Sequence, residues 1–298
     1  MPELPEVEHL RRSLEPSLVG SRIVAVHVRR SDIVRNRPGR TRVVPADLLD
    51  GATVRALDRR GKQLAIFGDG GSGLVVQLGM SGQLRWATGG SPPGANDHVH
   101  VRWQVVNVDG STRWLEFRDP RRFGGLSPFE SRPDLDERLW ARLGPDAATG
   151  AIGPLAARRL GAAHGSRRSL KSMLLDQSVV AGIGNIYADE ALFSAGIHPG
   201  LVAGRLTADL ADRLAREILR TLHEAIDAGG STLRDYVDAT GRAGSFQESH
   251  RVYGRGGQPC PRCRSTIRSA PLSGRTTSWC PTCQSRSIRR TGSSRSST

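Results

Sequence analysis

The 298-residue chain has little lysine, few cysteines and no long hydrophobic run, and each shortage excludes something. Only Lys62 and Lys171 are lysines, so nearly all of the positive charge comes from arginine. The four cysteines lie within 24 residues near the C-terminus, which excludes a disulfide framework for the whole chain. No segment approaches the roughly 18 apolar residues that span a bilayer, and residues 1–20 contain no apolar leader. We therefore expect a soluble, cytoplasmic protein with no membrane partner.

The charge is strongly positive, with 43 basic against 29 acidic residues and a net charge of +14. A surplus of this size indicates a polyanionic partner, most often nucleic acid. An arginine-rich composition would explain why arginine replaces lysine, but not why positive charge exceeds negative charge. An ammonium can give up a proton, whereas a guanidinium in effect cannot. Lys62 and Lys171 therefore mark positions that need an ammonium, unless they were retained by chance.

The first residues place a proline beside a carboxylate. If Met1 is removed, the nitrogen of Pro2 becomes a free secondary amine, with Glu3 directly next to it. Such an amine can attack a sugar aldehyde carbon and form a covalent iminium, and a neighbouring carboxylate can supply or remove the proton. The alternative interpretation is structural, because proline and acidic residues are common at helix starts.

The first half of the chain is predicted to contain one helix followed by a β-rich region. Apolar residues at helical spacing predict a helix over residues 5–18. Short β-rich runs such as 23–28, 74–78 and 99–103 then alternate with turn-forming residues up to about Phe129, which is typical of a β-sandwich or barrel. Residues 130–134 resemble a polar linker.

The second half is predicted to be helical. Helices are expected over residues 169–176, over 185–195, and from the capping residue Thr207 to Gly229. We therefore expect an α+β protein with two main domains. The predicted parts are an N-terminal β-sandwich domain at 1–132, a helical domain at 133–254, a cysteine-bearing module at 255–290 and a disordered basic tail at 291–298.

The cysteines form two C-x-x-C pairs, Cys260/Cys263 and Cys280/Cys283, with 16 residues between them. This spacing predicts one tetrahedral zinc site with four thiolate ligands, in preference to redox thiols. Because no coordination position stays open, the zinc is expected to be structural. Several arginines lie in or beside the pairs and predict a phosphate-facing loop, the alternative being a solvated charged knuckle: Arg262, Arg264, Arg268 and Arg275.

Two short turns present apolar side chains next to glycine or arginine. Residues 78–82 carry Met80 between glycines, and residues 119–124 carry Arg121 beside Phe123. Taken singly, Met80 and Phe123 would more often be core residues. In a strongly basic chain, the two turns together resemble wedges that fill a gap in a base stack.

These segments together resemble the bacterial formamidopyrimidine-DNA glycosylases. The resemblance is carried, in order, by residues 1–8, 61–62, 78–82, 119–124, 182–190, 229–233, 252–255 and 274–277 and by the four cysteines. Leu4 favours the oxidised-purine branch, because the endonuclease VIII branch usually has glycine there. The resemblance implies a bifunctional glycosylase and abasic-site lyase of base excision repair, acting on 8-oxoguanine and formamidopyrimidines. It also implies a helix–two-turn–helix element, a zinc-finger β-hairpin, and bacterial, nucleoid-associated activity as a monomer on damaged double-stranded DNA.

The resemblance also implies roles for the chemically active residues. Pro2 would attack C1′ of the damaged nucleotide and form a Schiff base. Glu3 would exchange protons during deoxyribose opening and base release. Lys62 would donate a proton in β-elimination, and Arg275 would do so in δ-elimination while clamping the flanking phosphate.

Further residues would bind the DNA around the extruded nucleotide. Met80, Arg121 and Phe123 would fill the space that the base leaves, with Arg121 facing the partner base. Asn185 would cap the helix–two-turn–helix element and bind the same backbone stretch. Glu6 would help hold the pocket.

The chain departs from the family pattern at three positions. Asn96 replaces a phosphate-contacting histidine, Gln77 stands where histidine is frequent, and Arg234 stands where lysine is common. Two alternatives therefore stay open: an endonuclease VIII-like glycosylase for other lesions, and an inactive damage-binding paralogue.

Overall fold

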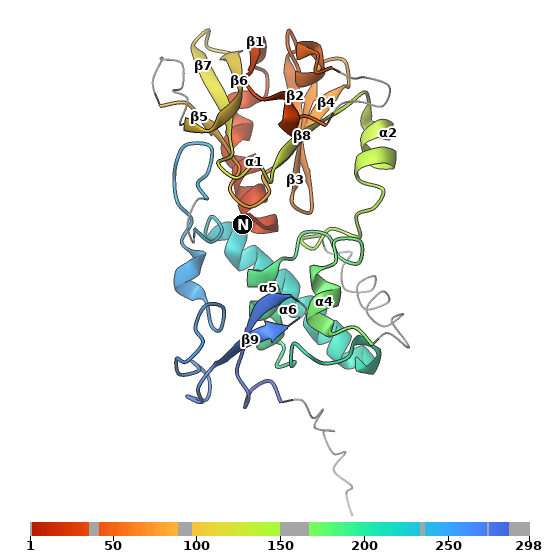
Figure 1. Cartoon of the computed structure of the whole chain (residues 1–298), viewed down its shortest axis with the longest axis vertical. Coiled ribbons are helices and arrows are strands. Elements are labelled where there is room, and N and C mark those ends of the chain that lie inside the picture. The colour runs from red at the N-terminus through yellow and green to blue at the C-terminus, as the bar shows by residue number, and fades with distance from the viewer. Residues whose placement is uncertain are drawn as a thin grey trace, which may run out of the picture.

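The computed structural model describes residues 2–35, 42–88, 97–149, 167–232, 236–272 and 274–285. A β-rich part and a helical part lie end to end, and the N-terminus lies where they meet (Figure 1). The predicted α+β arrangement is confirmed. Residues 286–298, which include the tail predicted to be disordered, lie outside the described residues, as do Asn96 and Arg234.

The predicted N-terminal helix is α1, Leu4–Leu18. Its apolar residues repeat every three or four positions, so a continuous stripe from Leu4 to Leu18 is buried. Glu3 is the residue before the first helical turn, and its backbone N–H donates to the Glu6 carboxylate at 2.7 Å. A proline at the second helical position removes no intrahelical hydrogen bond. The helix packs against both parts of the molecule through β2, β3 and α6.

Two four-stranded antiparallel sheets form the β-sandwich, with strand orders β1-β6-β7-β5 and β2-β3-β4-β8. Apolar side chains from both sheets and from α1 share one core. The bounds of the strands and of two short 3₁₀ turns are β1 Arg22–Val28, η1 Ser31–Ile33, η2 Pro45–Leu48, β2 Val54–Arg60, β3 Gln63–Gly68, β4 Gly73–Gln77, β5 Gln83–Trp86, β6 Val99–Val106, β7 Thr112–Arg118 and β8 Gly125–Phe129.

The segment predicted to be a polar linker is more structured than expected. The hydroxyl of Ser131 accepts from the backbone N–H of Asp134 and begins a short helix, α2 Arg132–Asp134, followed by a π-turn at Leu135–Leu139. Leu135 and Trp140 are buried against the sandwich. The composition of residues 130–134 gave no sign of this packing, because the buried residues lie just beyond residue 134.

The helical part contains α4 Leu170–Leu175, α5 Asn185–Ser194 and α6 Ala208–Asp227, with a 3₁₀ turn, η5 Ala203–Arg205, before α6. Thr207 caps α6 as predicted, since its hydroxyl accepts from the backbone N–H of Leu210. These helices share a core that also receives Leu4. The first residue of α1 therefore belongs to the second domain's core.

A 3₁₀ turn, η6 Phe246–Ser249, leads to the cysteine module. The module contains an antiparallel hairpin of β9 Arg268–Leu272 and β10 Arg275–Trp279. Its own small core joins Cys260 and Cys280 to Phe193 of α5. Among the described residues, no helix is long and apolar enough to cross a membrane.

Candidate active site and zinc centre

Glu3 lies buried at the start of α5, on the other domain. Its carboxylate accepts from the backbone N–H groups of Ile186 at 3.1 Å and Tyr187 at 3.5 Å, the first amides of that helix. The free N–H groups and the positive end of the helix dipole stabilise a carboxylate there. Next to it, the backbone N–H of Leu4 donates to the carbonyl of Gly182 at 3.1 Å. Pro2 is also buried, so the N-terminal segment is fixed in the junction between the domains.

Two glycines make this close approach possible. A Cβ on Gly184 would lie 2.2 Å from the carboxyl carbon of Glu3, and a Cβ on Gly182 would lie 2.4 Å from Leu4 Cδ1. Gly182 also has a φ of +110°, which side chains disfavour. The turn that carries Gly182 and Gly184 therefore approaches the Glu3 carboxylate directly.

Glu6 is a second buried carboxylate, one helical turn beyond Glu3. It accepts from the Tyr187 hydroxyl, from the backbone N–H of Ser231 at 2.7 Å and from that of Glu3. Burial, with a smaller contribution from Glu3, raises the pKa of Glu6, while its hydrogen bonds oppose that rise. The hydroxyl of Tyr236 donates to the Glu6 carbonyl at 2.8 Å. Glu6 thus joins α1, α5 and the loop after α6.

Lys62 lies in the two-residue turn between β2 and β3. Burial lowers the pKa of Lys62, the carboxylates of Glu3 and Glu6 raise it, and Arg275 lowers it further. Lys62 is thus within electrostatic range of Glu3, Glu6 and Arg275. A lowered pKa suits an ammonium that must give up a proton.

A buried ion-pair network holds the Lys62 turn in place. The carboxylate of Asp146 accepts from the backbone N–H of Gly61 at 2.6 Å and from the Arg59 guanidinium at 2.6 and 3.0 Å. Arg59 also donates to Glu8 of α1 at 3.0 Å and to the Gly61 carbonyl at 3.0 Å. The turn is therefore tied both to α1 and to the segment after the π-turn.

Arg275 is exposed at the start of β10, on the hairpin that carries the cysteines. The hairpin is anchored by a fully buried ion pair between Lys171 of α4 and Asp189 of α5, with N and O atoms 2.6 Å apart. The Lys171 ammonium also donates to Thr277 Oγ1 at 2.8 Å, and Asp189 accepts from the backbone N–H of Ser278 at 2.9 Å. Lys171, the second of the two lysines, therefore anchors the hairpin.

Asn185 is not the cap of α5, contrary to the prediction. Gly184 occupies the capping position, because a side chain there would collide with Glu3. Asn185 is the first helical residue, and its side-chain amide donates to the Thr276 carbonyl at 2.9 Å. It therefore joins α5 to the hairpin next to Arg275.

The two predicted wedge turns pack against each other. A Cβ on Gly79 would lie 2.5 Å from the backbone of Phe123 and Gly124, so glycine permits the contact. Asp119 accepts from the Ser81 hydroxyl at 2.6 Å and from the Gly124 N–H at 2.7 Å, linking the turns.

The side chains on these turns are available to a partner. Phe123 is 56% exposed, and the Arg121 guanidinium lies 5.7 Å from its ring centroid. Met80 is half-buried. Phe123 is not a core residue, which agrees with the wedge interpretation.

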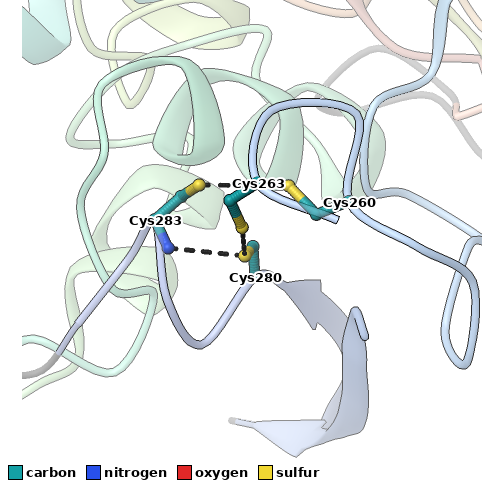
Figure 2. Close-up of side chains that lie close together, drawn as sticks. All are labelled: Cys260, Cys263, Cys280 and Cys283. Atoms are coloured by element: carbon teal, nitrogen blue, oxygen red, sulfur yellow. Dashed lines mark hydrogen bonds between the residues drawn. The ribbon is translucent and has the colours of Figure 1, made fainter. Parts of the chain in front are cut away.

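The four cysteine sulfurs gather at one point beside the hairpin (Figure 2). Sulfur–sulfur distances are 3.4 Å for Cys263–Cys280 and 3.9 Å for Cys260–Cys283, and all four lie within 4.8 Å of one another. Tetrahedral Zn–S bonds of about 2.3 Å require sulfurs roughly 3.8 Å apart. The site therefore suits one structural zinc ion.

Arg262 was predicted to face a phosphate, but it binds the end of α5 instead. Its guanidinium donates to the carbonyls of Phe193 at 3.1 Å and Ser194 at 3.2 Å and stacks 4.5 Å from the Phe193 ring centroid. A cation at the C-terminal end of α5 satisfies carbonyls that the helix leaves open. Arg262 therefore fixes the zinc module to the helical domain.

Gln77, one of the three departures, ends β4 and lines a cavity of about 220 Å³. Three arginines share that cavity: Arg35, Arg138 and Arg142. Gln77 thus lies beside arginines of the sandwich and of the segment that follows β8.

Three family models match the chain in the order of its structural parts. The formamidopyrimidine-DNA glycosylase N-terminal domain matches residues 1–126, the H2TH domain of the same enzymes matches 143–237, and the zinc finger found in FPG and IleRS matches 257–286. With the paired buried carboxylates, they define a DNA glycosylase of the helix–two-turn–helix class. The chain belongs to the formamidopyrimidine-DNA glycosylase family.

Individual relatives cover nearly the whole chain. The formamidopyrimidine-DNA glycosylase of Alkalilimnicola ehrlichii is 44% identical over 95% of this chain and 100% of its own length. The crystal structure of the MutM (Fpg) protein of Thermus thermophilus is 41% identical, with a TM-score of 0.80 over 95% of this chain and 98% of that one. Lactococcus lactis Fpg bound to DNA containing an abasic site is 33% identical, with a TM-score of 0.83 over 95% and 99%.

Several residues of the site carried no sequence signal for the contacts that they make. Asp146, Asp189 and Ser231 act through partners far away in the chain, and no local pattern points to such contacts. Lys171 had a weak signal, as one of only two lysines.

Proposed function

We propose that this DNA glycosylase is bifunctional, excising oxidised purines such as 8-oxoguanine and formamidopyrimidines and then cleaving the strand at the abasic site. The nucleophile is the nitrogen of Pro2 after removal of Met1. The observation that carries the proposal is the position of Glu3, whose carboxylate is held by the α5 amides beside Pro2. Glu3 raises the pKa of Lys62 and Arg275 lowers it, which supports a shared centre for these residues.

The reaction follows from these groups. The Pro2 nitrogen attacks C1′ and gives its proton to the Glu3 carboxylate, the bond from C1′ to the base breaks, and the base leaves with a proton from solvent. Glu3 protonates the ring oxygen of the sugar, which opens to give the iminium. The Glu3 carboxylate then takes the C2′ proton while Lys62 gives a proton to the departing 3′ phosphate, which completes β-elimination. In δ-elimination the C4′ proton goes to solvent, and Arg275 gives a proton to the departing 5′ phosphate. Water then releases Pro2.

The wedge turns and the hairpin bind the DNA. Met80, Arg121 and Phe123 fill the gap left by the extruded base, which offsets the few kcal/mol that extrusion costs. Asn185 and Arg275 contact the adjacent backbone. We propose that the protein acts as a monomer on damaged double-stranded DNA at the bacterial nucleoid.

The domain boundaries are part of the proposal. We place the catalytic β-sandwich domain at 1–132, the helix–two-turn–helix domain at 133–254, the zinc finger at 255–290 and the basic tail at 291–298. Limited proteolysis followed by mass spectrometry should give cuts between these parts.

Borohydride trapping on duplex containing 8-oxoguanine tests the chemistry. The wild type should form a covalent adduct, whereas Pro2→Gly and Glu3→Gln should lose excision and still bind the duplex. Wild-type turnover in either variant would contradict these roles. A wild type that binds without forming an adduct would indicate a damage-binding paralogue, and a preference for oxidised pyrimidines would indicate an endonuclease VIII-like enzyme.

A further inference from the structure

A buried histidine is linked to the Glu6 carboxylate by polar contacts and has no part in the reaction proposed above. His250 follows η6 and is only 8% exposed. Its ring makes edge-on contacts with Phe246, at 5.7 Å and 71°, and with Tyr253, at 5.4 Å and 82°. The two aromatic rings fix the orientation of the imidazole, so its Nε2 points in one direction.

That nitrogen begins a chain of polar contacts that ends at Glu6. His250 Nε2 lies 3.0 Å from Ser231 Oγ, and Ser231 Oγ lies 3.4 Å from the Tyr187 hydroxyl oxygen. Tyr187 donates to Glu6 Oε1, which also accepts from the backbone N–H of Ser231 at 2.7 Å. Four residues from α1, α5 and the two loops after α6 therefore share one hydrogen-bonded chain.

The number of available protons decides which group donates in each hydrogen bond between His250 and Glu6. The single hydroxyl proton of Tyr187 goes to Glu6, so its oxygen can only accept from Ser231. Ser231 then uses its own proton on Tyr187 and must accept from the Nε2–H of His250. Burial lowers the pKa of His250 to about 4, so the ring is neutral near pH 7 and carries one N–H for this bond. Hydrogen bonds aligned in one direction strengthen one another.

The loop held by this chain borders the active site. Gly229 and Gly230 lead into Ser231, and a Cβ on Gly230 would lie 2.7 Å from the Glu6 carboxylate. A small change in the Ser231 hydroxyl would therefore be transmitted through Tyr187 to the Glu6 carboxylate.

We propose that His250 is a positioning residue of the base pocket, which orients Glu6 and the loop at Gly229–Thr232 through Ser231 and Tyr187. The inference rests on the proposed function and deepens it, because it assigns a support to the pocket that receives the damaged base. An abasic site leaves that pocket empty. His250 should therefore matter for excision of a base and not for cleavage at a site that has already lost its base.

The test compares His250→Phe with His250→Gln. Phenylalanine keeps the ring packing and removes the donor, whereas glutamine places an amide N–H near the former Nε2. Single-turnover excision of 8-oxoguanine should fall about three- to tenfold in His250→Phe, the value of one lost hydrogen bond, and should largely return in His250→Gln. Cleavage of duplex with a preformed abasic site should stay at the wild-type rate in both.

His223→Phe is the matched control, since His223 is exposed on α6. Should His250→Phe fail to fold, Ser231→Ala cuts the same chain at its next link and should show the same split. Wild-type excision in His250→Phe, or an equal loss in both reactions, would overturn the inference. The proposed function is judged separately, by excision and borohydride trapping with the wild type.

Discussion

The contact between Gly184 and Glu3 gives the sharpest prediction, because substitution by alanine should act on the catalytic carboxylate alone. Gly184 has a φ of −125°, which alanine adopts without strain. The added Cβ would lie 2.2 Å from the Glu3 carboxyl carbon, whereas ordinary carbon–carbon contacts begin at about 3.5 Å. The carboxylate must therefore withdraw by roughly 1 Å, losing its hydrogen bond from Ile186.

A displacement of about 1 Å at a reacting group costs on the order of 10²-fold in rate. We expect Gly184→Ala to lower single-turnover excision by about that factor, and overpacking to lower the free energy of unfolding by about 1–3 kcal/mol. Gly70→Ala is the matched control, since nothing lies within 4 Å of its added Cβ. Both variants should be compared by excision kinetics and by urea unfolding.

A double-mutant cycle makes the test specific. In the Glu3→Gln background, Gly184→Ala should lower the residual rate far less than it does in the wild type, because the group it displaces is already inactive. Excision by Gly184→Ala at the rate of Gly70→Ala would refute the reasoning, and so would full additivity of the two substitutions.

Other contacts support four further predictions. Asp189→Ala leaves the Lys171 ammonium buried without its carboxylate and should cost about 3–5 kcal/mol in urea unfolding, with recovery when Lys171→Met is added. Phe123→Ala, at an exposed position, should change unfolding by less than about 0.5 kcal/mol yet weaken binding of lesion-bearing duplex in a titration. Removing the metal with a chelator should release about one zinc per chain and abolish DNA binding, which added zinc restores. Burial lowers the pKa of His250 from 6.5 to about 4, so the folded protein binds fewer protons there than the unfolded chain. The contribution of this group to the free energy of unfolding should be complete above pH 6.5 and should fall by up to about 3 kcal/mol as the pH drops through 4. His250→Phe should abolish that loss.

The elements that could be predicted from the sequence are those with a local signal. Each of these signals lies within a short stretch of sequence. They are the periodic apolar residues of α1, the cap at Thr207 and the spacing of the cysteines. The family resemblance added the helix–two-turn–helix element and the zinc finger, and family models of both match the chain.

The rest depends on contacts between distant segments. The sequence showed two glycines at 182 and 184 but not that Leu4 and Glu3 would fill the space beside them. It showed four arginines near the cysteines, but not that Arg262 would bind the end of α5. The linker at 130–134 was misjudged because a polar sequence can begin a helix whose buried residues come afterwards.

The amides that hold Glu3 belong to a helix 183 residues further along the chain. The acid thus comes from one half of the molecule and its cradle from the other, so neither half by itself contains a finished reaction centre. Any hinge motion that parted the halves would take the α5 amides away from Glu3 and leave its carboxylate without these donors, although Pro2 and Glu3 would stay together. In the proposed reaction, cleavage therefore requires that both halves stay together.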